Sequence, residues 1–262
     1  MEKVISQDGT LIAFHRRGGG PPLILVAGTG AANPTAWTAV IPTLEEHFMI
    51  YAVDRRGRGE SGDSPNYALE QEFEDIAAVG ESVGQPANLL GHSFGGLCAL
   101  EAAVRMRNLR KLILYEPYFP APGEEAYPKD LLEQMEAMLN AGDREGVLRE
   151  HYLKNVGMTM QEYEQMKSSP AWSMRLATAH TLPREMRGEA QYRFDAGRFQ
   201  AVQTPTLLLG GSDSTQFNRT IDAISGALPN CKTAVMPGQG HLAMYTAPDL
   251  FLREVLGFLL AE

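Results

Sequence analysis

Ser93 lies in the run Gly91-His92-Ser93-Phe94-Gly95, between an apolar strand-like segment and a helix-forming one. The pattern G-x-S-x-G in this context is typical of a sharp strand-to-helix turn that exposes a serine hydroxyl. Gly91 and Gly95 flank the turn, because a Cβ at either position would collide with the neighbouring strand or helix. Ser93 is therefore a candidate nucleophile, with its hydroxyl beside a helix N-terminus.

A serine nucleophile needs a base within hydrogen-bond reach, and the base needs a third group that fixes its tautomer. Of the six histidines, we favour His241 as the base, because it follows a late strand through a glycine-rich loop. We favour Asp213 as the third group, because it follows a buried strand and two glycines that let its carboxylate turn toward the histidine. Glu116, at the end of the preceding strand, is the alternative.

An oxyanion that forms during acyl transfer needs two preorganised backbone N–H donors. The amide of Phe94 is one candidate, since it directly follows the nucleophile at the start of a helix. The glycine-rich loop after the first apolar run supplies the second, and Thr29 is the preferred residue there, with Gly28 and Gly30 as alternatives.

The elements that must hold these residues are short apolar runs that alternate with helical patterns. Alternation of this kind indicates an α/β fold with a mostly parallel sheet that is covered by helices on both faces. The candidate residues follow the carboxyl ends of the strands, which is where ligands bind in such sheets. The runs after the predicted hairpin at 3–16 are 23–27, 48–53, 87–90, 112–115, 205–209 and 233–236. From 119 to 200 the alternation stops, and the chain is polar and helical in pattern.

Composition and the remaining motifs argue against several classes of partner and cofactor. The net charge of −9 argues against nucleic acid as a partner. No apolar run approaches the ~18 residues of a membrane span, so we expect no membrane association and a cytoplasmic location. The G-x-G-x-x-G match at 57–62 is not followed directly by a helix, and no metal-binding spacing is present. We therefore expect a small-molecule substrate and neither cofactor nor metal, with monomer and homo-oligomer both open.

The motifs together resemble the α/β-hydrolase superfamily, in its serine-nucleophile, esterase-like branch with a helical cap. The matching stretches, in family order, are 28–37, 54–61, 91–95 and the loops of Asp213 and His241. The resemblance implies an eight-stranded sheet, a core of 1–118 and 201–262, a cap of 119–200 after the sixth strand, and a Ser-His-Asp triad. Many members have His-Gly in the oxyanion loop, whereas this chain has Ala27-Gly28, which keeps the backbone donor but lacks the histidine that braces the loop.

The expected function is hydrolysis of a small, fairly apolar carboxylic ester through an acyl-enzyme. We expect Trp172, Met174 and His180 of the cap to line the substrate pocket. Activity should fall below about pH 6 to 7, because the attack needs neutral His241. Hydrolysis of a lactone, thioester, amide or C–C bond, or perhydrolysis, would use the same residues. A hydrolase-like binding protein with little turnover is the alternative from another class.

Overall fold

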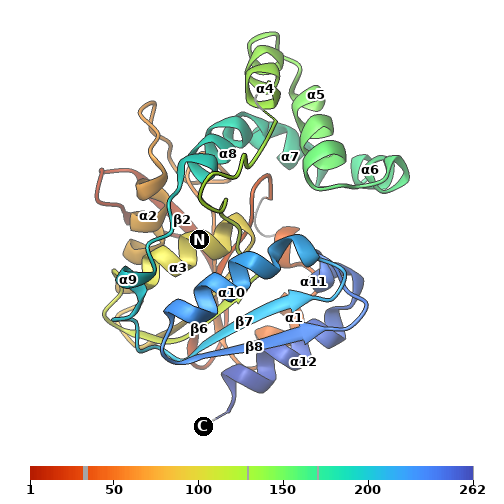
Figure 1. Cartoon of the computed structure of the whole chain (residues 1–262). Helices are drawn as coiled ribbons and strands as arrows, with labels where there is room; N and C mark the ends of the chain where they lie inside the picture. Colours follow the sequence, from red (N-terminus) through yellow and green to blue (C-terminus); the bar gives the residue numbers. More distant parts are fainter. Residues whose placement is uncertain (32–34, 129, 170, 262) are drawn as a thin grey trace.

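The protein is built around one twisted sheet of eight strands (Figure 1). The computed structural model describes residues 1–31, 35–128, 130–169 and 171–261. The strands are β1 (Glu2–Ile5), β2 (Leu11–Gly18), β3 (Pro22–Val26), β4 (Met49–Val53), β5 (Ala87–His92), β6 (Leu109–Tyr115), β7 (Thr206–Gly211) and β8 (Cys231–Met236). Their order in the sheet is β1-β2-β4-β3-β5-β6-β7-β8.

All neighbouring strands from β4 to β8 are parallel, and β2 alone runs antiparallel to both of its neighbours. The expected eight-stranded, mostly parallel sheet is therefore confirmed. Strands β3, β5 and β6 are buried on both faces, which explains their continuous apolar sequence.

Two apolar clusters cover the two faces of the sheet. Side chains alternate along each strand, so Ile24 and Val26 of β3 pack on one face and Leu23 and Leu25 on the other. The first face is covered by α2 (Leu69–Ser82), α3 (Phe94–Ala103) and α10 (Asn218–Ala227). The second is covered by α1 (Ile41–Leu44), α11 (Ala243–Thr246) and α12 (Pro248–Leu259).

The chain between β6 and β7 is helical and stands above one edge of the sheet (Figure 1). It comprises α4 (Leu131–Asn140), α5 (Arg144–Arg149), a π-helical turn (Glu150–Asn155), α6 (Met160–Lys167), α7 (Trp172–Thr178), α8 (Leu182–Gln191) and α9 (Ala196–Phe199). We call 119–200 the cap. It has an apolar cluster of its own between Tyr127 and Met186, whereas Phe119 and Phe199 pack into the core beneath.

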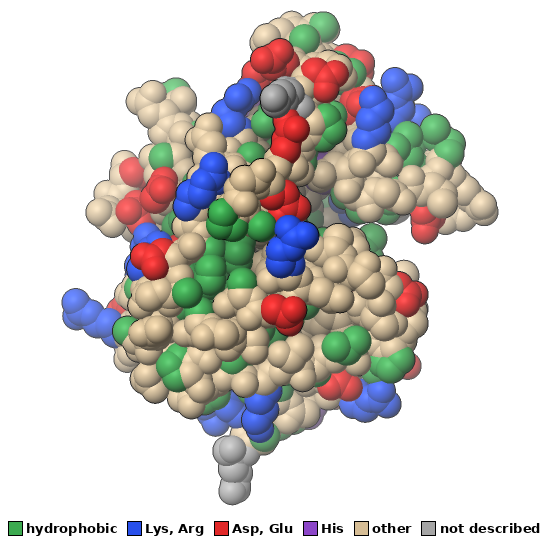
Figure 2. Space-filling view, viewed as in Figure 1, with side chains coloured by type: hydrophobic (Ala, Val, Ile, Leu, Met, Phe, Trp, Pro, Cys, Tyr) green, Lys and Arg blue, Asp and Glu red, His purple; other side chains and the backbone are tan. Residues whose placement is uncertain are grey.

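Acidic and basic side chains are interspersed over the face seen in Figure 2, which is hollowed beneath the lobe that carries α6. Of the helices in the described ranges, none is long and apolar enough to cross a membrane.

Candidate active site

Ser93 occupies the turn between β5 and α3 in a strained backbone conformation. Its φ and ψ are 55° and −126°, and among the described residues only Glu116 is another non-glycine residue with positive φ. Such conformations cost about 1–3 kcal/mol and persist where the surrounding structure enforces them. They cluster at functional sites, so both residues become candidates on this ground alone.

The glycines around Ser93 permit the close packing that enforces this turn. A Cβ on Gly91 would lie 2.3 Å from the carbonyl oxygen of Gly95, and a Cβ on Gly95 would lie 2.4 Å from that of Val26. A side chain at either position would therefore collide with the backbone, as the sequence predicted. A Cβ on Gly28 would approach the Cβ of Ser93 to 3.0 Å, so the predicted oxyanion loop lies directly against Ser93.

Glu116 holds the imidazole of His241. Nδ1 of His241 lies 2.6 Å from Oε2 of Glu116, and the amide of Gly211 donates to Oε1 at 2.7 Å. The Glu116 side chain is fully buried, and both of its oxygens are occupied. Since a carboxylate only accepts, the proton of the imidazole lies on Nδ1, and Nε2 is free to act as a base.

Asp213 does not make the contact that the sequence predicted for it. Its carboxylate is exposed and accepts a hydrogen bond from the hydroxyl of its neighbour Ser212 at 2.9 Å. Tyr115 of β6 is in register with Leu209 of β7, and β7 continues through Gly211, so Asp213 lies further along the chain than the point at which Glu116 leaves the sheet. Strand β6 lies between β5 and β7, and its end therefore brings Glu116 nearer to the elbow. The prediction that Asp213 orients His241 was therefore wrong, and Glu116, the alternative residue, makes this contact.

Burial shifts the titration of this pair toward its uncharged forms. It lowers the pKa of His241 to about 4 and raises the pKa of Glu116 to about 7, with the Gly211 hydrogen bond opposing the second shift. Their mutual contact acts against both shifts, because a carboxylate and an imidazolium attract each other. The two groups titrate together, so the first proton added as the pH falls binds near pH 7 and takes away the base.

The side chains of His92, Tyr115 and Phe217 hold His241 and its loop in place. Nε2 of His92 donates to the carbonyl of His241 at 2.9 Å, and burial lowers the pKa of His92 to about 3, so it remains neutral. The hydroxyl of Tyr115 donates to the carbonyl of Gly240 and accepts from the amide of Ala243 at 3.0 Å. The ring of Phe217 stacks on His241, with centroids 4.4 Å apart. The imidazole is therefore fixed in position and orientation.

The two predicted oxyanion donors are available. Within the described ranges, neither the amide of Thr29 nor that of Phe94 donates to a backbone carbonyl. Thr29 lines the same cavity as Ser93, and Phe94 begins α3, where the helix dipole favours negative charge. Arg55, which follows β4, donates to the carbonyls of Ala27 at 2.9 Å and Gly28 at 3.0 Å and so braces this loop.

Ser93 and His241 open into a cavity of about 310 Å³ between the core and the cap. Its walls are mixed, with aromatic and methionine side chains beside a few polar ones. Among the polar ones is Arg175 of α7, whose Nη1 donates to the hydroxyl of Tyr152 at 2.5 Å and whose Nε is buried without a partner. In the described part of the chain no carboxylate lies within ion-pair distance of Arg175. The cavity thus contains a guanidinium that is not neutralised by the protein.

The three cap residues expected to line the pocket are not among those that surround this cavity. Trp172 packs edge-on against Tyr163 within the apolar cluster of the cap. His180 lies 3.8 Å from Asp63, and Met174 is half-buried on α7. The expectation was wrong for Trp172 because the hydrophobic interior of the cap takes up its ring, and for His180 because its imidazole lies beside Asp63. Arg175, one of the cap residues that do line the cavity, was not singled out from the sequence.

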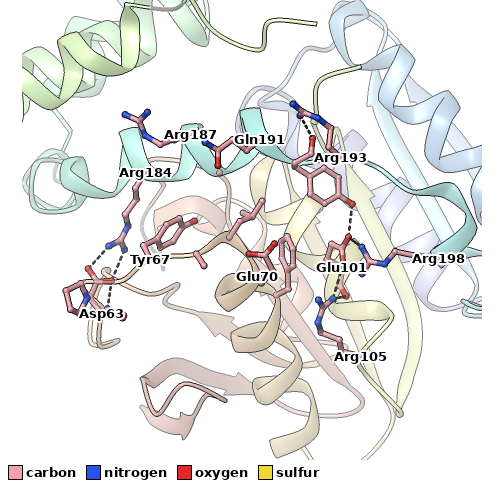
Figure 3. A pocket seen from close by; sticks show the side chains of 17 residues that line it. Asp63, Tyr67, Glu70, Glu101, Arg105, Arg184, Arg187, Gln191, Arg193 and Arg198 are labelled. Carbon is pink, nitrogen blue, oxygen red and sulfur yellow. Dashed lines mark hydrogen bonds and ion pairs between the residues drawn. The ribbon is translucent and has the colours of Figure 1, made fainter. Parts of the chain in front are cut away.

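A second, larger hollow of about 1070 Å³ lies between α2 and α8 (Figure 3). Its arginines mostly face carboxylates, as Figure 3 shows for Arg184 with Asp63 and for Arg105 and Arg198 with Glu101. Arg105 and Arg198 share the single carboxylate of Glu101, and Arg193 donates to backbone carbonyls, so this hollow also carries excess positive charge. Ser93 is not among the residues that line it.

Comparison with known proteins decides the family. The model of the alpha/beta hydrolase family matches residues 23–254. The chain belongs to this family. It is 28% identical to N-formylmaleamate deformylase of Pseudomonas putida, over 97% of this chain and 95% of that protein. It is 24% identical to 2-(acetamidomethylene)succinate hydrolase of Mesorhizobium japonicum, over 94% and 90% of the two chains.

Solved structures agree with this assignment. The structure of an alpha/beta hydrolase from Sphaerobacter thermophilus is 31% identical and superposes with a TM-score of 0.83, covering 98% of this chain and all of the other. The family match and the named hydrolases among the relatives make this alpha/beta hydrolase an enzyme, a hydrolase.

Proposed function

We propose that this alpha/beta hydrolase is a serine hydrolase that cleaves a carboxylic ester or an amide of a small acid through an acyl-enzyme on Ser93. The observation that carries the proposal is the 2.6 Å contact of Glu116 with His241, beside the strained elbow of Ser93. A half-buried serine that lines the cavity, an oriented imidazole and a buried carboxylate can serve as nucleophile, base and orienting group respectively.

In the proposed reaction, the Ser93 oxygen attacks the carbonyl carbon of the substrate and its proton passes to Nε2 of His241. Glu116 stabilises the imidazolium that forms, and the Thr29 and Phe94 amides hold the oxyanion. The tetrahedral intermediate then collapses, and the leaving alcohol or amine takes the proton from His241. Water, deprotonated by His241, attacks the acyl-enzyme, and the acid is released as Ser93 regains its proton.

Arg175 favours a substrate that carries a carboxylate of its own. Arg175 is half-buried, but its Nε is buried without a partner, and a bound anion would satisfy this donor and neutralise the guanidinium. The names of the two curated relatives described above, an N-formylmaleamate deformylase and an acetamidomethylene succinate hydrolase, also denote N-acyl derivatives of carboxylic acids. The proposal therefore changes the expected substrate from a fairly apolar ester to an anionic ester or amide.

The test is steady-state hydrolysis of two 4-nitrophenyl esters, the neutral butyrate and the anionic hemisuccinate, which have acyl chains of equal length. We expect both esters to be cleaved, the hemisuccinate with the higher kcat/KM, and both reactions to require Ser93. Tight binding of either acyl group without turnover would favour the hydrolase-like binding protein instead. Turnover that survives Ser93→Ala would rule out the proposed nucleophile.

A further inference from the structure

We propose that Arg55 is the positioning residue of the oxyanion hole and that the cap keeps it in place through Glu185. The proposal rests on the proposed function, since it assigns a part to Arg55 in that reaction. Arg55 takes the place of the histidine that is absent at Ala27, and it reaches the loop from β4 rather than from within the loop.

The hydrogen bond to Gly28 acts directly on one oxyanion donor. The carbonyl of Gly28 and the N–H of Thr29 belong to the same planar peptide unit, and in a trans peptide they point in opposite directions. Nη2 of Arg55 donates to that carbonyl at 3.0 Å, and the Ala31 amide donates to it at 3.3 Å, so Arg55 supplies the shorter and charged contact that directs the Thr29 N–H. A charged donor on the carbonyl also polarises the peptide and makes its N–H a stronger donor.

Arg55 also touches the residue that carries the other donor. Its guanidinium carbon lies 4.7 Å from the centroid of the Phe94 ring. One rigid, planar group therefore packs against both halves of the oxyanion hole, the loop after β3 and the first residue of α3. Lysine at this position would retain the charge but could not span these contacts.

Two buried carboxylates hold the guanidinium. Nη1 of Arg55 donates to Glu72 of α2 at 3.1 Å, and Nη2 donates to Glu185 of α8 at 3.0 Å. All three side chains are at most 1% exposed. Glu185 also binds Arg58 at 2.6 Å, so the cap is anchored to the loop after β4 at the residue that fixes Arg55. The oxyanion loop is thereby joined to the cap through one arginine.

Arg56 offers a matched control. It is the next residue, it is equally buried, and it is paired with Asp75 at 2.8 Å and Asp8 at 3.0 Å. Its hydrogen bonds lead to α2 and the first hairpin and not to the oxyanion loop. A general loss of packing or charge in this region should affect both arginines alike.

The experiment compares Arg55→Lys and Arg56→Lys for kcat and KM on the 4-nitrophenyl esters. Loss of one oxyanion donor typically lowers kcat about 10²–10³-fold, and a displaced donor should cost about 10–100-fold. We expect that loss in kcat for Arg55→Lys, with KM changed less than about 3-fold, and a kcat for Arg56→Lys within about 2-fold of wild type. Equal kcat in wild type and Arg55→Lys, or an equal fall in both variants, would overturn the proposal.

A second readout does not depend on turnover. Polarisation of the Gly28 carbonyl affects the amide nitrogen of Thr29, so its NMR resonance should move in Arg55→Lys and stay in Arg56→Lys. If the Thr29 resonance does not move in Arg55→Lys, the positioning role of Arg55 is contradicted, whether or not the wild type hydrolyses esters. If the resonance moves while the wild type hydrolyses no ester, the contact of Arg55 with the loop is supported and the proposed function alone fails. If Arg55→Lys does not fold, Glu185→Gln serves instead, with a smaller loss of kcat and a Thr29 shift expected.

Discussion

Oε2 of Glu116 lies 2.6 Å from Nδ1 of His241, while the carboxylate of Asp213 is exposed and bound to Ser212. Glu116 follows β6 and Asp213 follows β7, so the acid comes from the strand next to that of Ser93. This relationship separates two residues that look equivalent in the sequence.

The first prediction compares Glu116→Gln with Asp213→Asn. The glutamine can present its NH₂ group to Nδ1, which stabilises the wrong tautomer of His241, so kcat should fall on the order of 10⁴-fold. Asp213→Asn should leave kcat within about 2-fold, since Asp213 is a surface residue away from the reacting groups. Steady-state kinetics of both variants, with circular dichroism to establish folding, makes the comparison. A large loss in Asp213→Asn alone would restore the original assignment.

The second prediction concerns the acid limb of the pH profile. The Glu116–His241 pair takes up its first proton near pH 7, so kcat/KM of the wild type should fall as the pH drops below about 7. Glu116→Gln removes the group that accepts this proton and the anion that stabilises the imidazolium. The residual activity of that variant should therefore persist to lower pH, toward the pKa of about 4 that burial gives His241. An unchanged acid limb would argue against control by this pair.

The third prediction tests recognition of the substrate carboxylate by Arg175. A hydrogen bond to a charged group contributes about 1.5–3 kcal/mol, so Arg175→Met should lower kcat/KM for the hemisuccinate ester about 10–100-fold. The neutral butyrate ester should lose less than about 3-fold, which excludes general damage to the site. Arg187, which is paired with Glu136 on α4, gives the control Arg187→Met. Equal losses for both esters would count against an anion-binding role.

The fourth prediction follows from Glu189, a cavity residue whose buried carboxyl accepts from the Tyr127 hydroxyl. Burial raises its pKa from 4.5 to about 8, so the stability it contributes is complete below about pH 4.5 and is lost as the pH rises through 8. Relative to wild type, Glu189→Gln should therefore gain about 4 kcal/mol in unfolding free energy between pH 5 and pH 9. Urea unfolding at both pH values measures it. The exposed Glu133→Gln should show no such gain.

The fifth prediction concerns the elbow glycines. A Cβ on Gly95 would lie 2.4 Å and 2.6 Å from two backbone carbonyls that cannot move aside, so Gly95→Ala should destabilise the fold by at least about 3 kcal/mol. Gly226 in α10 has open space around its Cβ position, and Gly226→Ala should instead stabilise it by about 0.5–1 kcal/mol. Thermal unfolding of both variants gives the sign directly. A stable Gly95→Ala would contradict the close packing at the elbow.

The sequence predicts the parts of the site that depend on local pattern. Ser93 could be found because a strand, two glycines and a helix lie within one short segment, and His241 because it follows a late strand. The choice between Glu116 and Asp213 depends on strand order and on how far β7 extends, which local pattern does not contain. Arg175 and Arg55 could not be identified from the sequence for a similar reason, because their proposed roles depend on contacts between segments far apart in the chain. In the cap, without strand alternation, the direction of each side chain is set by tertiary packing alone.

The most direct test of the account is the reaction of the folded protein with a fluorophosphonate, which phosphonylates an activated serine with loss of fluoride. Peptide mass mapping should find one modified residue, Ser93. Labelling should be absent in Ser93→Ala, which removes the reacting oxygen, and much slower in Glu116→Gln. Absence of labelling at Ser93 in folded wild-type protein, or labelling at another serine, would contradict the proposed nucleophile.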